Sequence, residues 1–324
     1  MNNVMISIII PVYNSELTIE RCLNSLANQT FSNIEVIVIN DGSTDNSLKK
    51  IERYQNVISN LKIISQVNGG VSKARNEGIK LSQGRFIMFL DSDDYLDKNC
   101  CKVVIENIKN ADMVIFGLNI YKNNIILRTP HLEDKNVYLK ENIDNYWEIR
   151  KINLGPCNKL YKRDLITNLF DESMSLGEDT KFVIDYLKNV RGINVISQCM
   201  YNVCLDNEES LNRKYREDKL DQLIIIRNYE NNFLKEMYQI YDSRIYNEYI
   251  YDIHVILHDT VKNNLPLKYI KENVNKLNYK SLKGYVQLKN KYYSLFFYLV
   301  SYKKYTCLYI LLKIRILIER LKGV

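Results

Sequence analysis

The sequence predicts an α/β fold in which a mostly parallel sheet carries helices on both faces and a helical region follows it. Two observations lead to this prediction. Up to residue 116, short apolar runs alternate with segments of helical periodicity, which is typical of parallel strands joined by crossover helices. From about residue 217 onward, long helical segments follow one another without strand-like runs between them. We therefore place a domain boundary near residue 215.

Strands are expected where short apolar runs end in polar or turn-forming residues. Such runs occupy residues 7–10, 35–39, 61–64, 86–90 and 113–116. Helices are expected after Ser15, after residues 43–45, after Gly70, and near residues 97–109, 219–237, 245–261 and 267–277. Ser15 is the expected N-cap of the first helix, whose apolar face consists of Ile19, Cys22, Leu23 and Leu26.

The positive charge of the chain belongs to its C-terminal tail. The net charge is +7, but residues 281–324 alone hold nine Lys or Arg and one acidic residue, Glu319. The first 280 residues hold 36 basic and 37 acidic side chains. An anionic partner is therefore expected at the tail. The balanced charge of the remaining residues gives no indication of a nucleic-acid enzyme.

The cysteines and the N-terminus favour a reducing, cytosolic setting. The seven cysteines form no CxxC pair, so reduced structural thiols are expected rather than a disulfide framework or a zinc site. Met1 is followed by no basic segment before the first strand, so we expect no cleavable signal peptide.

Ligands of parallel α/β sheets bind beyond the carboxyl ends of the strands. That rule selects residues 11–16, 40–45, 67–70 and 91–94, all rich in polar or turn-forming side chains. The dinucleotide fingerprint GxGxxG is absent, so a nicotinamide cofactor is not expected.

The acidic segment Asp91-Ser92-Asp93-Asp94 directly follows a buried strand. Carboxylates there need a compensating charge, which a divalent cation bridging to a diphosphate supplies. The alternative is that these side chains only cap the next helix. Capping does not explain both Asp91 and Asp93, and Asp94 is the candidate for a structural role.

Six short motifs follow one another along the first two thirds of the chain: residues 10–14 (IPVYN), 41–45 (DGSTD), 68–70 (NGG), 74–78 (ARNEG), 90–94 (LDSDD) and 177–179 (GED). In this order and at this spacing they make the sequence resemble glycosyltransferase family 2, including bacterial enzymes of cell-surface polysaccharide synthesis. The resemblance covers residues 5 to about 210. It implies a GT-A catalytic domain at 1–215, with a nucleotide-binding part at about 1–117 and an acceptor part at about 118–215, and leaves 216–324 as a helical C-terminal domain.

The resemblance implies a UDP-sugar donor, a divalent cation (Mn²⁺ or Mg²⁺) and a role for each matching residue. Asp93 would bind the metal. The donor would be bound by Pro11, Tyr13, Glu16, Asp41, Asn68, Arg75, Asp91 and Ser92, of which Asp41 would contact uracil and Asp91 the ribose or sugar hydroxyls.

Several of these residues have structural alternatives. Pro11 could simply end a strand, and Glu16 could favour a helix N-terminus. The segment containing Asp41 is also a turn and helix cap. Arg75 suits phosphate or an acidic partner, and its alternative is a solvated charge on a helix.

By the same resemblance, Asp179 is the general base that deprotonates the acceptor hydroxyl. The alternative is that Asp179 only favours a helix N-terminus. One carboxylate on the acceptor side, with metal help for the leaving group, is enough for a single inverting displacement. The sequence lacks the QxxRW motif of processive synthases, so one sugar per acceptor is expected.

Residues 292–318 combine Tyr, Phe, Leu and Ile with Lys and Arg, which suits the surface of an anionic membrane. The alternatives are packing on the catalytic domain or a homodimer contact. The overall expectation is a cytoplasmic enzyme on the inner face of the cell membrane. It would transfer one hexose or N-acetylhexosamine from a UDP-sugar to a lipid-linked precursor of a cell-surface polysaccharide. The alternatives are glycosylation of a teichoic-acid-like polymer or protein, and a non-catalytic sugar-nucleotide-binding scaffold.

Overall fold

The computed structural model describes residues 4–152, 154–205, 218–277 and 285–321. The chain forms two compact units, one of residues 1–210 and one of residues 211–324. The division between them falls within residues 206–217. The boundary predicted near residue 215 also lies there, outside the described residues.

The N-terminal half of the first unit is a parallel sheet in the order β3-β2-β1-β4. Its strands are β1 (Ile6–Val12), β2 (Ile34–Asp41), β3 (Leu61–Gln66) and β4 (Phe86–Phe89). β1, β2 and β4 are buried along their whole length, because helices cover both faces of the sheet and their apolar runs need no polar face. The predicted parallel sheet is confirmed.

An antiparallel strand joins this half to the rest of the sheet. β9 (Lys159–Lys162) lies between β4 and β6 (Met113–Lys122) and runs antiparallel to both. The sheet continues through β10 (Ile193–Cys204), parallel to β6, to the edge strand β5 (Tyr95–Leu96). β7 (Ile125–Arg128) pairs with β6, and β8 (Lys135–Val137) pairs with β10.

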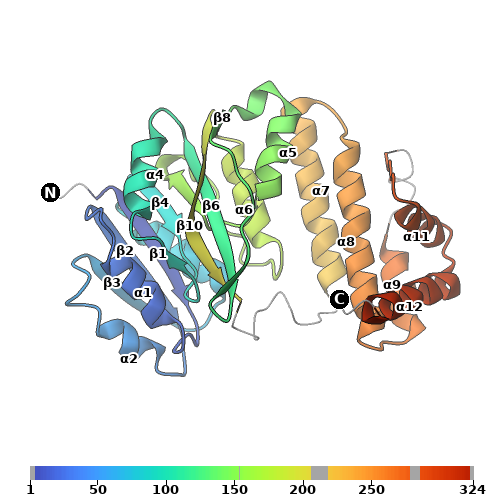
Figure 1. Ribbon diagram of the computed structural model, residues 1–324, viewed down its shortest axis with the longest axis horizontal. Helices are drawn as coiled ribbons and strands as arrows, with labels where there is room; N and C mark the ends of the chain where they lie inside the picture. The colour runs from blue at the N-terminus through green and yellow to red at the C-terminus, as the bar shows by residue number, and fades with distance from the viewer. Residues whose placement is uncertain (1–3, 153, 206–217, 278–284, 322–324) are drawn as a thin grey trace. The chain divides into compact units, whose positions relative to one another are not determined.

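Helices connect the strands of the first unit (Figure 1). They are α1 (Ile19–Ala27), α2 (Ser47–Glu52), α3 (Val71–Leu81), α4 (Cys100–Ile108), α5 (Ile143–Ile152) and α6 (Glu178–Leu187), with short 3₁₀ helices at 139–141 and 163–165. The prediction of Ser15 as the N-cap of α1 is wrong. Thr18 is the N-cap, because residues between Ser15 and Thr18 form a turn in which the Ser15 carbonyl accepts from the Thr18 and Ile19 amides.

Helix α3 packs closely on the sheet and carries residues of the predicted site. Its buried Ala74 lies in one apolar cluster with Ile37 and Ile39 of β2. A methyl group at Gly78 would come within 2.3 Å of Ile9 Cγ2, so glycine allows the helix to approach β1. Arg75, on the same helix, is also buried, with 4% of its surface exposed.

The second unit is helical, as predicted. It contains α7 (Lys219–Tyr238), α8 (Ser243–Lys262), α9 (Leu267–Lys276), α11 (Lys291–Ser301) and α12 (Tyr305–Leu321). α8 is central and contacts the other four helices. Of the helices in the described part of the chain, none is both long enough and apolar enough to cross a membrane.

Candidate functional site

The polar segments that follow β1, β2, β3 and β4 meet at one edge of the sheet. The Asn14 amide donates to Ser43 Oγ over 3.1 Å, which joins the segments after β1 and β2. The Ser15 and Ser92 hydroxyls are 2.7 Å apart, which joins the segments after β1 and β4. The chain therefore brings together the segments that the strand-end rule selected.

Asp41, at the end of β2, fixes the segment after β3. Its carboxylate accepts from the backbone amides of Gly69 and Gly70, both over 2.8 Å, and from Gln66 Nε2 over 2.7 Å. These donors satisfy most of the acceptor capacity of this buried carboxylate. Asp41 thus holds the turn that carries Asn68, whose own side chain is exposed.

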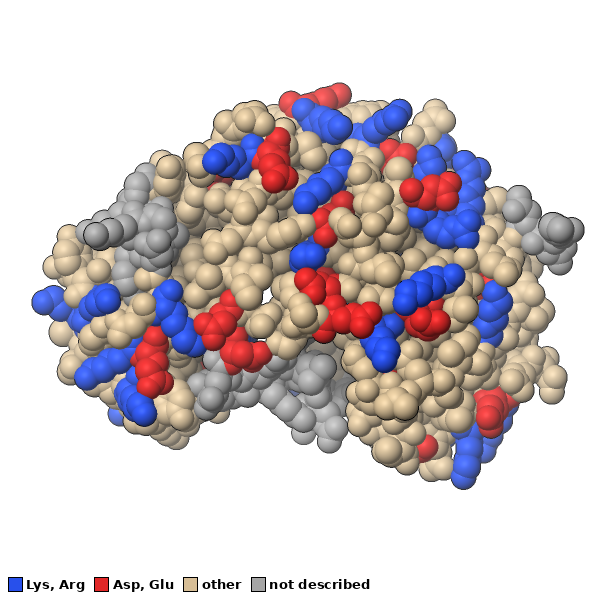
Figure 2. All heavy atoms as spheres, turned by 180° about the vertical axis from the view of Figure 1, so that it is seen from behind, with Lys and Arg blue, Asp and Glu red and all other residues tan. Residues whose placement is uncertain are grey.

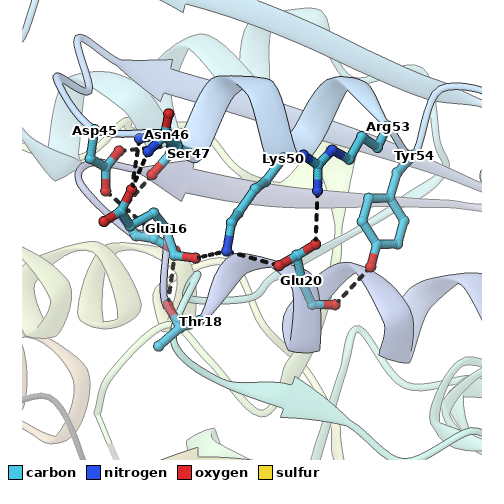
Figure 3. A network of polar contacts seen from close by, with 10 residues as sticks. Glu16, Thr18, Glu20, Asp45, Asn46, Ser47, Lys50, Arg53 and Tyr54 are labelled. Carbon is cyan, nitrogen blue, oxygen red and sulfur yellow. Dashed lines mark hydrogen bonds and ion pairs between the residues drawn. The ribbon is translucent and has the colours of Figure 1, made fainter.

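Glu16 fixes the segment after β2 (Figure 3). Its carboxylate accepts from the backbone amide and the side-chain amide of Asn46, over 2.9 and 3.0 Å. Its backbone carbonyl accepts from Lys50 Nζ, and its amide donates to Asp45. Glu16 therefore does contact a helix N-terminus, as the structural alternative predicted. The helix is α2, whose N-cap is Asn46.

Tyr13 is open to solvent beside these fixed segments. Its side chain is 53% exposed, whereas Pro11, two residues earlier in β1, is buried. A half-exposed aromatic ring held on a rigid strand end can stack on a planar ligand group with little loss of freedom.

The centre of the site is Arg75, which binds two carboxylates from distant parts of the chain. Its Nη1 donates to Asp179 Oδ1 over 2.6 Å, and its Nη2 donates to Asp91 Oδ1 over 2.9 Å. Arg75 is 4% exposed and its guanidinium lies 5.3 Å from the ring centre of Phe170. Arg75 is therefore not a solvated helix charge, and its partners in this structure are acidic.

The two carboxylates keep this guanidinium charged. Burial alone would lower the pKa of Arg75, but Asp179 and Asp91 raise it above its ordinary value. Arg75 Nε is buried and has no hydrogen-bond partner among the described residues.

Asp179 combines burial with an exposed edge. It is the second residue of α6, after Gly177, which has the left-handed backbone that glycine adopts without strain (φ 86°). Desolvation raises the pKa of Asp179, and attraction to Arg75 offsets part of that rise. Its side chain is still 35% exposed, so a proton donor can reach it. A carboxylate of raised pKa and open access suits proton abstraction.

Asp93 and Asp94 differ in their surroundings. Burial and the nearby Asp91 raise the pKa of Asp93 to about 6. Burial also raises the pKa of Asp94, which is 5% exposed and accepts from the Cys204 amide over 2.9 Å. Asp94 therefore ties the acidic segment to β10, as expected of a structural residue.

Asp93 and its neighbours suit a divalent cation that a ligand helps to hold. Repulsion between these carboxylates would be relieved by a bound cation, and oxygen ligands suit Mg²⁺ or Mn²⁺. Among the described residues, no group of three or more His, Cys, Asp or Glu side chains could hold a metal. A cation bound by Asp93 would need further oxygen ligands from the bound molecule.

Three further residues lie against this centre. Cys157 Sγ is 3.5 Å from Asp91 Oδ2, and the Tyr201 hydroxyl accepts from the Asp91 amide over 3.2 Å. Lys159 is completely buried in β9, and burial lowers its pKa to about 7. Its Nζ donates to the carbonyls of Gly155 and Cys157, so it shapes the turn beside Asp91.

The face shown in Figure 2 carries Lys and Arg side chains interspersed with Asp and Glu side chains.

Known proteins resemble the chain in sequence. Residues 7–170 match Glycosyl transferase family 2. The uncharacterized glycosyltransferase EpsJ of Bacillus subtilis (strain 168) is 35% identical over 217 residues, which cover 64% of this chain and 62% of EpsJ. The poly(ribitol-phosphate) β-N-acetylglucosaminyltransferase TarS of Staphylococcus aureus (strain MW2) is 31% identical over 208 residues, covering 60% of this chain and 34% of TarS. The matches thus span less than two thirds of either relative.

Solved structures share the fold. The crystal structure of S. aureus TarS 1–349 in complex with UDP-GlcNAc matches 98% of this chain and 92% of that chain, with a TM-score of 0.73 and 22% identity. The structure of GalNAc-T7 with UDP, GalNAc and Mn²⁺ matches 72% of this chain and 50% of that one, with a TM-score of 0.53 and 15% identity.

The Arg75 cluster makes a prediction about stability. Arg75→Met leaves two carboxylates without their cation, and we expect a loss of about 2–3 kcal/mol in the free energy of unfolding. This lies below the loss for a fully buried pair because both carboxylates are partly exposed. Urea unfolding measures it. Asp179→Asn in the same chain should restore part of the loss, and equal stability of single and double variants would contradict the assigned pairing.

The raised pKa of Asp93 makes a prediction about pH. In the folded chain Asp93 takes up a proton near pH 6, whereas its ordinary pKa is 3.8. Its ionised form therefore destabilises the fold above pH 6, and this penalty disappears as the pH falls below about 4. We expect Asp93→Asn to raise the free energy of unfolding by about 1–2 kcal/mol at pH 7.5 and not at pH 4. A pH-independent difference in urea unfolding would show that Asp93 has an ordinary pKa.

Proposed function

The chain belongs to glycosyl transferase family 2, and we propose that it transfers a single hexose or N-acetylhexosamine from a UDP-sugar to a precursor of a cell-surface glycan. The observation that carries this proposal is the contact of Arg75 with both Asp91 and Asp179. It places a base candidate beside a donor-site candidate, although 88 residues of sequence separate them. A transferase needs these two groups on either side of one reacting carbon.

In the proposed mechanism, Asp179 takes the proton of the acceptor hydroxyl as that oxygen attacks the anomeric carbon. The bond from that carbon to UDP breaks in the same step, so the configuration inverts. Arg75 holds Asp179 in place and stabilises its ionised form until the proton arrives. Asp93 is the residue proposed to hold Mn²⁺ or Mg²⁺, whose charge would favour departure of the diphosphate.

Donor binding is proposed for two groups of residues. Tyr13, Asn68, Pro11 and Asp41 would surround the base and ribose, with Asp41 also fixing the turn that carries Asn68. Glu16 would act on the donor through the segments that it holds. Arg75, Asp91 and Ser92 would lie toward the diphosphate and the sugar. The UDP-GlcNAc in the TarS structure supports a UDP-sugar as the donor class.

Two acceptors fit the proposal. A lipid-linked polysaccharide precursor rests on the family resemblance alone, because the relative EpsJ is named only as an uncharacterized glycosyltransferase. A teichoic-acid-like polymer is favoured by the name of TarS and by the structural match to TarS 1–349, which includes nearly all of this chain. A protein acceptor has no specific observation in its favour.

We propose that the second unit places the enzyme on the inner face of the cell membrane through α12. This helix has two apolar faces. One is buried and consists of Leu308, Leu312 and Ile316. On the opposite side, Ile310, Ile314 and Leu317 are 50–58% exposed, and Lys313 and Arg320 lie beside them. An exposed apolar stripe with flanking lysine and arginine suits an anionic lipid surface, with a homodimer contact as its competitor.

The catalytic proposal predicts that Asp179→Asn lowers glycosyl transfer by a factor of about 10² to 10⁴, which is the range for loss of a general base. Binding of UDP with Mn²⁺, measured by calorimetry, should survive because Asp179 contributes no donor contact. The assay is release of UDP from a panel of UDP-sugars, with teichoic-acid and lipid-linked acceptors. Glu178→Gln, one residue earlier in α6, is the control. Undiminished transfer by Asp179→Asn would remove the base assignment, and a wild-type chain that only binds UDP would favour the scaffold alternative.

The tail proposal predicts that Ile314→Ser/Leu317→Ser weakens binding to anionic vesicles by about tenfold, because the two side chains lose apolar area that the membrane would bury. Deletion of residues 292–324 should abolish the contribution of the tail, but it also removes the buried face of α12 from α8 and α9. Leu312→Ser serves as the control for that packing, through its effect on thermal unfolding. A change in sedimentation coefficient without a change in vesicle binding would instead identify a homodimer contact.

A further inference from the structure

The β6–β7 hairpin exposes three large apolar residues in a row. Ile125, Ile126 and Leu127 are 65%, 52% and 56% exposed. Because successive side chains of a strand point to opposite faces, apolar groups stand out from both faces of β7. Among the described residues β7 pairs only with β6, so its other edge is open as well. Soluble domains usually cover or charge the apolar side chains of an edge strand, and exposed ones mark an interaction surface.

The hairpin stands at the catalytic edge of the sheet. β6 runs parallel to β4, because both are antiparallel to β9. The carboxyl end of β6 therefore leaves the sheet on the same side as the acidic segment that follows β4 (Figure 1).

Contacts at its base tie the hairpin to the site. The Tyr121 ring packs against Tyr95, the residue directly after Asp94, with ring centres 6.1 Å apart. The Tyr121 carbonyl also accepts from the Leu205 amide over 2.8 Å, and Thr129 Oγ1 donates to Asn119. These contacts fix the hairpin relative to the acidic segment. A partner bound to the hairpin would therefore have a fixed orientation relative to the site.

The positive charge of the hairpin indicates that its partner is anionic. Lys122 and Arg128 bracket the apolar residues, and both are exposed. Residues 113–132 contain no Asp or Glu. We propose that the β6–β7 hairpin docks on an anionic lipid surface, with Ile125–Leu127 entering the headgroup region and Lys122 and Arg128 at the lipid charges.

This surface fits lipid better than a second copy of the chain. Pairing of β7 with β7 of another copy would bring two cationic hairpins together without a compensating acidic residue in either. Anionic lipids neutralise the same charges. The open backbone edge of β7 limits entry to the interfacial region, because unpaired amides and carbonyls are excluded from hydrocarbon.

The inference deepens the proposed function, since a hairpin on the membrane would present the site to a lipid-linked acceptor. It uses a surface in the first unit and is independent of α12. A probe inside the hairpin is therefore needed. The chain has a single tryptophan, Trp147, which is 5% exposed in α5 and gives a constant background.

The test uses the full chain with Ile126→Trp and vesicles of phosphatidylcholine with and without phosphatidylglycerol. With phosphatidylglycerol we expect a blue-shifted emission and quenching by brominated lipid, because tryptophan prefers the membrane interface. Val57→Trp is the matched control, since Val57 is 59% exposed in the first unit but lies in the turn before β3. It should show neither change. Adding Lys122→Gln/Arg128→Gln to Ile126→Trp should lower the apparent affinity for the anionic vesicles by about tenfold.

Three outcomes would overturn the proposal. One is vesicle binding without quenching of the Ile126→Trp probe, which would leave α12 as the contact. Another is absence of binding to anionic vesicles. The third is a blue shift without lipid that grows with protein concentration and disappears in Ile125→Ser/Leu127→Ser, which would identify a contact between copies of the chain.

A second measurement separates this inference from the proposed function. Hydrolysis of the UDP-sugar by Ile125→Ser/Leu127→Ser should equal that of the wild type, because the hairpin takes no part in donor chemistry. Lipid quenching with no UDP release from any donor by the wild type would refute the proposed function and leave the lipid contact standing.

Discussion

The arrangement of the site depends on one buried guanidinium. Arg75 is a buried residue of α3, the helix that Gly78 allows to approach β1. From there it binds Asp91 at the end of β4 and Asp179 at the start of α6. An arginine is suited to this because its planar group offers several donors in fixed directions and stays charged when buried. Without that cation both carboxylates would lose an ion pair in a partly buried position.

The antiparallel strand β9 completes the surroundings of this centre. It inserts between β4 and β6, and the turn before it places Cys157 against Asp91. The ammonium of Lys159, buried behind that turn, binds its carbonyls. Arg75 and Lys159 both act on Asp179, whose pKa burial raises, and their charges offset part of that rise.

Each unit has an apolar surface outside the candidate site for which we propose a partner. On α12 a stripe lies opposite the buried face, and on the β6–β7 hairpin three residues project from both faces of an edge strand. Both carry lysine and arginine beside the apolar groups. Apolar side chains flanked by cations suit the interface of an anionic membrane, so we propose the same kind of partner for both surfaces.

The sequence by itself determined the parallel strands, the segments at their carboxyl ends, the acidic cluster and the helical second unit. Periodicity and strand-end turns are local properties that do not need the rest of the fold.

Only the tertiary structure decided the remaining features of the site and the surface. Arg75 could have been a solvated charge, because its two partners lie 16 and 104 residues away. β9 was missed because its short run contains two lysines and its burial comes from neighbouring strands. Ser15 is not the N-cap of α1 because a turn precedes the helix and Thr18 takes that position. The apolar run Ile125–Leu127 has the same composition as a buried strand, and only the fold shows that it is exposed. These features depend on which distant segments pack together, and no short stretch of sequence contains that information.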